Sequence, residues 1–369
     1  MLVGGGSGGH FYPLIAVAER LKAYSLKDEQ YELYYMGPEK YDESELENNN
    51  ISFVYCPAGK KRRYFSFLNI LDSFGIFFGF FVAIYKLYIL YPDVVFSKGS
   101  ATSVPVTLAA WLLKIPIVIH ESDSKPGRAN KLASKFATYI AISFDEVAEF
   151  FPKKKIALTG IPIRTAFMQP AENPHAELGI PSDKPVIFVT GGSLGAVRVN
   201  NLVLDSLDEL LPDYTVVHQA GEPHAEIVQS SAASLVENSS LLDHYFVKGK
   251  LSGREMDLAQ SAAVLIISRA GAGTIFEIAH KGIPSILIPI PEEISHDQRT
   301  NAYAYARAGA ASVLEEDNLT DGLLNAEVIR IMSDEKLYRN MGIAAQQFAK
   351  NDAAEQLAAT LISITKEHD

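Results

Sequence analysis

Hydrophobic and polar positions alternate between two patterns along this chain. Residues 1–3 are apolar, a glycine-rich stretch follows, and apolar residues then return at helical spacing at Leu14, Ala18 and Leu21. This order predicts a buried strand, a loop and a helix, with Pro13 in the first helical turn. It recurs at "PVIFVTGGSLGA" (185–196), where the apolar helix positions are Val199, Val203, Leu207 and Leu210. A third stretch, "VLIISRAGAGTIFEIAHKGIPSILIPI" (264–290), predicts the strand, helix and strand of a parallel βαβ unit.

Five prolines interrupt every regular pattern in residues 159–185, which predicts a linker. The chain has 369 residues and 48% of them are hydrophobic, enough for two packed domains. We therefore expect an α/β protein of two Rossmann-like domains facing a cleft, residues 1–163 and 164–344, with a helix at about 345–369 packing back on the first. Ligands would bind at the carboxyl ends of the strands, in the cleft.

Net charge and cysteine content limit the possible ligands and the cellular compartment. The formal net charge of −11 argues against broad nucleic-acid binding, which needs a basic face. Cys56 is the single cysteine, so no intramolecular disulfide can form, and no signal peptide precedes the first strand. We expect a cytoplasmic protein.

Residues 64–91 are nearly all apolar and follow the basic cluster Lys60, Lys61, Arg62 and Arg63. A transmembrane span, a core helix and a helix that dips into the membrane surface are all open. Asp72 and Lys86 leave thirteen uncharged residues between them, short for a span. We favour the surface helix, because anionic headgroups attract basic residues. Insertion would use Phe65, Phe67, Phe77, Phe78, Phe80 and Phe81.

The first glycine-rich stretch, "GGGSGGHFYP", predicts an anion site. Glycines let a ligand approach the backbone, and the N–H groups of a following helix N-terminus favour negative charge. Gly4, Gly6 and Gly9 match G-x-G-x-x-G, but no acidic residue is convincingly placed for a nicotinamide cofactor, and no P-loop is present. A tight turn that binds nothing is the alternative.

His10 is the candidate catalytic base. The positive end of a helix dipole disfavours the imidazolium form, so a neutral imidazole is available near pH 7. A structural histidine that bonds the loop backbone is the alternative.

Six motifs together resemble one family. "GGGSGGHFYP", "HESDSKPGRANKLA", "TGIPIR", "GGSLGA", "SRAGAGTIFEIAHKGIP" and "HDQRTNA" occur in the order and spacing typical of the peptidoglycan N-acetylglucosaminyltransferases of glycosyltransferase family 28. The resemblance covers essentially the whole chain. It implies the two-domain GT-B fold and inverting transfer of N-acetylglucosamine from UDP-N-acetylglucosamine to lipid I, giving lipid II. It also implies a peripheral enzyme at the cytoplasmic side of the plasma membrane.

The resemblance also implies a role for individual residues. Ser193 would contact the donor diphosphate together with Arg164, the backbone of Val247 the uracil, Glu277 the ribose and Gln298 the sugar hydroxyls. The predicted donor-binding set is Ser7, Gly8, Gly9, Asp123, Arg164, Ser193, Val247, Ala272, Gly273, Thr274, Glu277 and Gln298. The predicted acceptor-binding set is Gly4, Gly5, Gly6, His120 and Glu121, with His10 as the base.

Residue chemistry agrees with these roles and leaves alternatives. A carboxylate can accept bonds from both ribose hydroxyls, and a guanidinium suits phosphate. Glu277 as a solvated helix residue, Ser193 as only an N-cap and Arg164 as an ordinary surface arginine stay open.

The chain departs from the family pattern at several positions. Ser122 and Asp123 stand where an amide pair is usual, Ile161 and Leu194 replace polar residues, and "SKGSATSVP" replaces a glycine-tyrosine loop. No D-x-D pair is present, so we expect no metal and no cofactor besides the substrate. A transferase with another lipid acceptor, a nucleotide-sugar epimerase and a non-catalytic nucleotide-sugar-binding subunit are the alternative functions.

Overall fold

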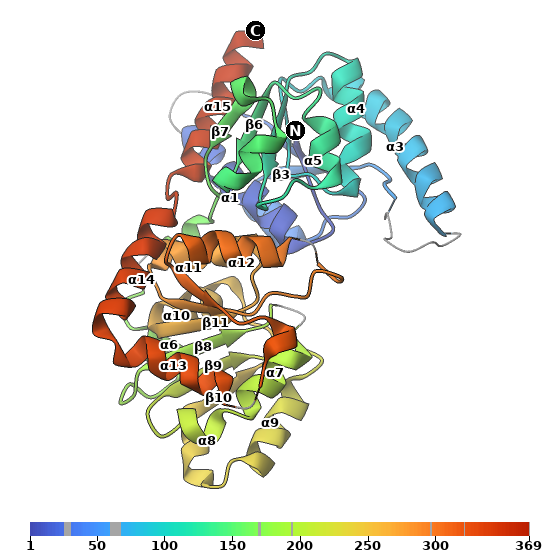
Figure 1. Cartoon of the computed structure of the whole chain (residues 1–369). Helices are drawn as coiled ribbons and strands as arrows, with labels where there is room; N and C mark the ends of the chain where they lie inside the picture. The colour runs from blue at the N-terminus through green and yellow to red at the C-terminus, as the bar shows by residue number, and fades with distance from the viewer. Residues whose placement is uncertain are drawn as a thin grey trace. The chain divides into compact units, whose positions relative to one another are not determined.

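The computed structural model describes residues 1–25, 31–59, 68–168, 171–192, 195–295, 297–320 and 322–368. The chain divides into two compact units, Met1–Thr165 with Lys350–Asp369 (unit 1) and Ala166–Ala349 (unit 2). Figure 1 labels their helices and strands. The division after Thr165 differs from the expected one after residue 163 and assigns Arg164 to unit 1, where it contacts Glu45 and Tyr12.

Unit 1 is built on a parallel sheet with the strand order β3-β2-β1-β4-β5-β6-β7. Its strands are β1 (Leu2–Val3), β2 (Leu33–Gly37), β3 (Ile51–Tyr55), β4 (Val95–Ser97), β5 (Ile117–Glu121), β6 (Tyr139–Ile142) and β7 (Ile156–Leu158). Its helices are α1 (Gly8–Ser25), α2 (Glu43–Asn48), α3 (Leu68–Leu90), α4 (Val104–Leu112), α5 (Arg128–Ala133) and α15 (Ala353–His368).

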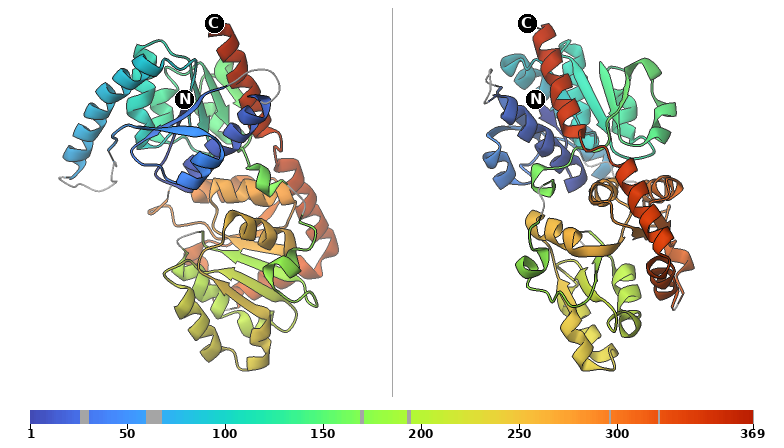
Figure 2. Two further views of the ribbon diagram at one scale, coloured as in Figure 1. Left: turned by 180° about the vertical axis from the view of Figure 1, so that it is seen from behind. Right: turned by 90° about the vertical axis from the view of Figure 1, so that its left-hand side faces the viewer.

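Both faces of this sheet are covered, which explains why its strands are apolar on both sides. One core contains α1 and α15, where Leu14 and Leu361 are buried. The other core contains α3, α4 and α5, with Leu87, Val106 and Ala133 buried. Figure 2 shows α15, in red, lying along unit 1.

Unit 2 has a second parallel sheet with the order β10-β9-β8-β11-β12-β13. Its strands are β8 (Val186–Thr190), β9 (Thr215–Gln219), β10 (Tyr245–Lys248), β11 (Ala263–Ser268), β12 (Ser285–Leu287) and β13 (Ala311–Val313). Its helices are α6 (Pro174–Leu178), α7 (Val197–Leu204), α8 (Leu207–Leu210), α9 (Ala225–Leu235), α10 (Gly253–Ala262), α11 (Ala272–Lys281), α12 (Gln298–Arg307), α13 (Leu323–Ser333) and α14 (Glu335–Phe348). The two units together also contain short 3₁₀ turns: η1 (Ala101–Ser103), η2 (Asp145–Phe150), η3 (Lys153–Lys155), η4 (Thr165–Phe167), η5 (Ser239–His244) and η6 (Glu316–Asn318).

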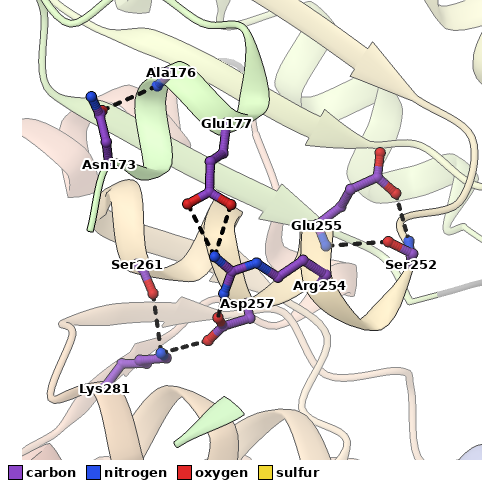
Figure 3. A network of polar contacts seen from close by, with 9 residues as sticks. All are labelled: Asn173, Ala176, Glu177, Ser252, Arg254, Glu255, Asp257, Ser261 and Lys281. Carbon is purple, nitrogen blue, oxygen red and sulfur yellow. Dashed lines mark hydrogen bonds and ion pairs between the residues drawn. The ribbon is translucent and has the colours of Figure 1, made fainter. Parts of the chain in front are cut away.

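A polar network ties α6, α10 and α11 together (Figure 3). Asp257 is completely buried on α10 and accepts hydrogen bonds from Lys281 (2.6 Å) and Arg254 (3.2 Å). Arg254 also donates to Glu177 of α6 at 2.8 Å. Because Lys281 is the last residue of α11, this network fixes the direction of the helix whose first turn was predicted to bind the donor.

Two local predictions were wrong. Helix α1 begins at Gly8, so Pro13 lies inside the helix and not in its first turn. The reason is that the carbonyl of Ser7 already accepts the N–H groups of His10 (3.1 Å) and Phe11 (3.2 Å). The linker is also less irregular than expected, because Asn173 caps the short helix α6 within it.

Residues 68–90 of the apolar segment form α3, and one face of this helix is exposed. Ala83 and Leu87 are buried in unit 1, and Phe80 is half-buried against the same core, which removes Phe80 from the expected insertion set. The other side, the α3 face, is more than half exposed at each of its residues: Phe77, Phe78, Phe81, Tyr85, Tyr88 and Ile89. A purely internal core helix is therefore excluded. Among the described residues, no helix combines the length and the hydropathy that crossing a membrane requires.

Candidate functional site

Each sheet has a switch point, where the helices that follow two neighbouring strands cover opposite faces of the sheet. In unit 1 it lies between β1 and β4, so the loop at 4–7 and the residues after Ser97 meet at the carboxyl edge. In unit 2 it lies between β8 and β11, which brings together the described loop residues after Thr190 (191–192 and 195–196) and the loop at 269–271. Open parallel sheets bind ligands at such points.

The loop of unit 1 needs its glycines for close packing. A Cβ at Gly4 would lie 3.0 Å from the His10 carbonyl oxygen and 3.2 Å from the Lys98 Cβ. A Cβ at Gly5 would lie 2.8 Å from the Tyr35 hydroxyl, which donates to the Gly4 carbonyl at 2.5 Å. Gly6 has a φ of +82° and open space around it. The loop is therefore tight at its base and open at its tip.

His10 lies in the first turn of α1, as predicted, and its Nδ1 is 2.7 Å from the Ser7 hydroxyl. Burial, and then the charge of Lys98, lower the pKa of His10 to about 4. The imidazole is therefore neutral at pH 7 and has the protonation state that a base requires. Ser7, Gly8 and Gly9 precede it in the chain, and within the first turn the His10 N–H already donates to the Ser7 carbonyl at 3.1 Å.

Lys98 was not among the predicted residues, although it is central to this edge of unit 1. It is only 2% exposed, and its ammonium donates to His120 Nδ1 at 2.5 Å and to the Ser122 hydroxyl. His120 Nε2 in turn donates to the Gly160 carbonyl at 2.8 Å. Burial and Lys98 hold the pKa of His120 well below its usual range. His120 is thus a neutral residue with both ring nitrogens engaged by the protein.

Glu121 organises the turn that carries Asp123. It accepts hydrogen bonds from the backbone N–H of Asp123 (3.2 Å) and Gly127 (2.9 Å) and from Asn130 Nδ2 (3.0 Å). Burial raises the pKa of Glu121, and these donors oppose that effect. Glu121 therefore fixes the half-buried Asp123 after β5, and Asn130 is a further residue that sequence reasoning missed.

The loop of unit 2 has its own steric requirement. A Cβ at Gly195 would lie 2.0 Å from the Ala220 carbonyl oxygen, and Gly195 has a φ of +75°. The Gly192 N–H donates to the Thr190 hydroxyl at 3.0 Å, which fixes the start of the loop. Ser193, predicted to bind the diphosphate, and Leu194 lie outside the described residues.

Residues 272–274, which were also predicted to bind the donor, form the beginning of helix α11. Ala272 is its first residue, Gly273 has open space where a side chain would be, and Thr274 is half-buried. Glu277 follows one turn later, and its Oε2 accepts a hydrogen bond from Nε2 of the fully buried Gln260 at 3.3 Å. Gln260 was not predicted, because only the packing of α10 on α11 brings it to Glu277.

Two other predicted donor residues lie at separate places in unit 2. Gln298 is the first residue of α12 and accepts a hydrogen bond from the Ile290 N–H at 3.2 Å. Val247 lies half-buried in β10 against the core.

Arg164 belongs to unit 1. Its guanidinium lies 2.9 Å from the Glu45 carboxylate and 4.2 Å from the centre of the Tyr12 ring. Its role toward the donor phosphate stays a prediction. Within the described ranges, no three His, Cys, Asp or Glu side chains are grouped closely enough to hold a metal ion.

Comparison with family models accounts for both units. Residues 1–142 match the glycosyltransferase family 28 N-terminal domain, and residues 186–357 match the family 28 C-terminal domain. The chain belongs to glycosyltransferase family 28. The predicted resemblance and the two-domain GT-B fold are thereby confirmed.

Similar proteins extend this assignment over nearly the whole chain. The UDP-N-acetylglucosamine–N-acetylmuramyl-(pentapeptide) pyrophosphoryl-undecaprenol N-acetylglucosamine transferase of Treponema denticola is 36% identical, over 97% of this chain and 93% of its own. The crystal structure of Acinetobacter baumannii MurG matches with a TM-score of 0.76 at 26% identity, covering 98% of each chain. A putative UDP-N-acetylglucosamine 2-epimerase from Listeria monocytogenes matches with a TM-score of 0.72 at 14% identity, covering 100% of this chain and 97% of its own, which shows a shared fold alone.

Proposed function

We propose that this family 28 enzyme transfers N-acetylglucosamine from UDP-N-acetylglucosamine to the muramyl 4-hydroxyl of undecaprenyl-diphosphate-linked N-acetylmuramyl-pentapeptide, converting lipid I into lipid II. The observation that carries the proposal is a glycine loop at each switch point, one of them followed by a neutral histidine. The name and the 36% identity of the Treponema denticola relative support the choice of donor and acceptor.

In this proposal unit 2 binds the donor. Backbone N–H groups of the loop at 191–196 and of α7 receive the diphosphate, as helix N-termini do for anions. Ser193 and Arg164 add contacts to it. The carboxylate of Glu277, steadied by Gln260, accepts hydrogen bonds from the ribose hydroxyls. Gln298 contacts the sugar hydroxyls and the Val247 backbone contacts the uracil.

Unit 1 holds the acceptor and the base. The loop of Gly4, Gly5 and Gly6 faces the acceptor diphosphate, and His120 and Glu121 support the same edge. His10 takes the proton of the 4-hydroxyl while that oxygen bonds to the anomeric carbon. The bond from this carbon to the UDP oxygen breaks, UDP leaves with the electron pair, and the configuration inverts. Loop N–H groups and Arg164, rather than a metal ion, offset the diphosphate charge.

A transfer assay tests the function directly. The purified protein is incubated with radiolabelled UDP-N-acetylglucosamine and a lipid I analogue, with and without EDTA. We expect a labelled lipid product and one UDP per transfer, unaffected by the chelator. Epimerised sugar nucleotide without acceptor would instead indicate an epimerase, and UDP binding without turnover a non-catalytic subunit. Transfer to a different polyprenyl-linked sugar, but not to lipid I, would change the acceptor.

We also propose that the enzyme binds the cytoplasmic face of the plasma membrane through the α3 face. Six large apolar or aromatic side chains on one helix surface suit shallow insertion between headgroups. The basic cluster Lys60, Lys61, Arg62 and Arg63, together with Phe65 and Phe67, precedes α3 in sequence but lies outside the described residues. Its charges would overcome repulsion between an acidic protein and an anionic leaflet.

Vesicle cosedimentation tests this attachment. We expect binding to phosphatidylglycerol vesicles that weakens in high salt. Because each basic residue contributes about 1 kcal/mol, Lys60→Ser with Lys61→Ser should weaken binding roughly 30-fold. The matched control is Lys153→Ser with Lys154→Ser on the exposed turn before β7, which should change binding little. Equal effects of both pairs, or no binding at low salt, would contradict the proposed surface.

A further inference from the structure

Lys98 occupies the switch point of unit 1 and lies close to His10. Its backbone N–H donates to the Val3 carbonyl at 2.9 Å, which joins the end of β4 to the end of β1. A Cβ placed at Gly4 would lie 3.2 Å from the Lys98 Cβ and 3.0 Å from the His10 carbonyl oxygen, closer than side chains normally pack. The small size of Gly4 therefore lets the lysine and the histidine approach the glycine loop together.

The charge of Lys98 is not cancelled by a contacting carboxylate. Its ammonium donates to His120 and Ser122, which are both neutral. Glu121 and Asp123 act on Lys98 only through space, since the described residues offer it no ion pair within 4.0 Å. A buried cation without a paired anion is costly for stability, so its presence at a switch point indicates a function.

This charge is present in the pH range that matters for a histidine base. Burial lowers the pKa of Lys98 to about 7, so the ammonium form predominates at lower pH, where an imidazole would take up a proton. The titratable groups that act on or contact Lys98 are His120 and Glu121 of β5 and Asp123 in the turn after it. Burial has the larger effect on the pKa of His10, and the charge of Lys98 lowers it further.

We propose that Lys98 is a positioning residue that keeps His10 unprotonated while an anionic diphosphate occupies the glycine loop. The inference rests on the proposed role of His10 as the base. A diphosphate beside His10 would stabilise the imidazolium, and a protonated histidine cannot accept the proton of the acceptor hydroxyl. The charge of Lys98, whose Cβ lies beside Gly4, opposes that field. Its bonds to His120 and Ser122 hold the ammonium in place.

Histidine NMR tests this inference without turnover. The full-length protein with ¹³C-labelled histidine is titrated from pH 8 to pH 4.5, with and without saturating inorganic pyrophosphate, and His10→Ala assigns the resonance. We expect His10 to remain neutral in the wild type in both conditions. In Lys98→Met with pyrophosphate its midpoint should rise by at least one pH unit. An unchanged midpoint would overturn the proposal.

Two further variants separate charge from structure. Lys98→Gln removes the charge but keeps a hydrogen-bond donor, so it should shift His10 as Lys98→Met does and serves if the methionine variant does not fold. Ser122→Ala removes one hydrogen bond of the ammonium and keeps its charge, so His10 should stay neutral over the titrated range, as in the wild type. A shift in Ser122→Ala equal to that in Lys98→Met would assign the effect to structure and overturn the proposal.

The pH dependence of turnover provides an independent readout. In Lys98→Met the fall of kcat on the acidic side of its pH profile should move to higher pH by at least one unit, and activity should recover at pH 9. Absence of transfer by the wild type would refute the proposed function, whereas a normal wild type with an unshifted variant profile would refute only the role of Lys98.

Discussion

Among the described residues, Lys98 of unit 1 and Lys281 of unit 2 both have side chains largely withdrawn from solvent, but their charges have different surroundings. Lys281 of unit 2 has a 14% exposed side chain and lies 2.6 Å from the Asp257 carboxylate, with Ser261 as a further acceptor. Lys98 of unit 1 is 2% exposed, and the described side chains to which it donates, His120 and Ser122, are both neutral. The first charge is neutralised by contact, and the second is not.

The difference separates a structural charge from a functional one. The Asp257–Lys281 pair joins α10 to α11, the helix that carries Glu277, and its two opposite charges offset each other by direct contact. The field of Lys98 reaches His10 and His120, whose pKa values it lowers. We infer that unit 2 is built to hold a ligand with uncharged donors and one carboxylate, and unit 1 to control where a proton resides.

Replacing His10 should have the largest effect. In the proposed function His10→Ala removes the base, so kcat should fall about 100- to 10,000-fold, while the affinity for UDP should stay nearly intact because the proposal assigns donor binding to unit 2. Steady-state kinetics and calorimetry measure the two quantities. His175→Ala, on α6 of unit 2, is the control and should leave both unchanged. An unchanged kcat in His10→Ala would return His10 to a structural role.

Replacing Lys281 should destabilise the protein. Lys281→Met leaves the buried Asp257 carboxylate with Arg254 alone, and breaking a buried pair in this way costs about 3 kcal/mol. Urea denaturation measures the free energy of unfolding. The exposed Lys336 of α14 provides the matched substitution, Lys336→Met, which should change it by less than about 0.5 kcal/mol. Equal values for the two variants would remove the structural role of the pair.

Replacing Glu277 should weaken donor binding and spare unit 1. Glu277→Ala should reduce the affinity for UDP-N-acetylglucosamine by about 1.5 to 3 kcal/mol, because hydrogen bonds to a charged group are lost. Glu277→Gln keeps one acceptor oxygen, so its affinity for the donor should lie between that of the wild type and that of Glu277→Ala. Calorimetry that finds wild-type affinity in Glu277→Ala would exclude Glu277 from the donor site.

Replacing Lys98 by methionine, the substitution proposed above for Lys281, should have the smallest effect. It should stabilise the protein, whereas Lys281→Met should destabilise it. Lys98→Met removes an unpaired buried charge, so the free energy of unfolding at pH 7 should rise by about 1 kcal/mol. The folded protein releases the Lys98 proton above about pH 7 and the unfolded chain only near 10.5, so the unfolded state binds more protons between them. Wild-type stability therefore rises with pH over this range, and the advantage of Lys98→Met should shrink. Denaturation at pH 7 and pH 10 compares them, and a destabilised Lys98→Met at pH 7 would contradict this interpretation.

Local patterns were enough to predict much of the fold. Apolar runs followed by glycines and helical spacing gave two parallel sheets with a glycine loop after β1 and after β8, because strand, turn and helix preferences act over neighbouring residues. The same locality placed His10 in a helical first turn and Glu277 one turn after Ala272. Motif order then indicated the family, since the motifs keep their spacing over the whole chain.

Contacts between distant segments decided the rest. Lys98 and Gln260 gave no signal, because their importance comes from the pairing of β4 with β1 and the packing of α10 on α11. The sequence of residues 68–90 is apolar on all sides, so only the packing of α3 on unit 1 determined which face stays exposed. Hydrophobic period and glycine position are written into a few neighbouring residues, whereas burial of a charge depends on which strands become neighbours, and here the two strands are more than ninety residues apart in the chain.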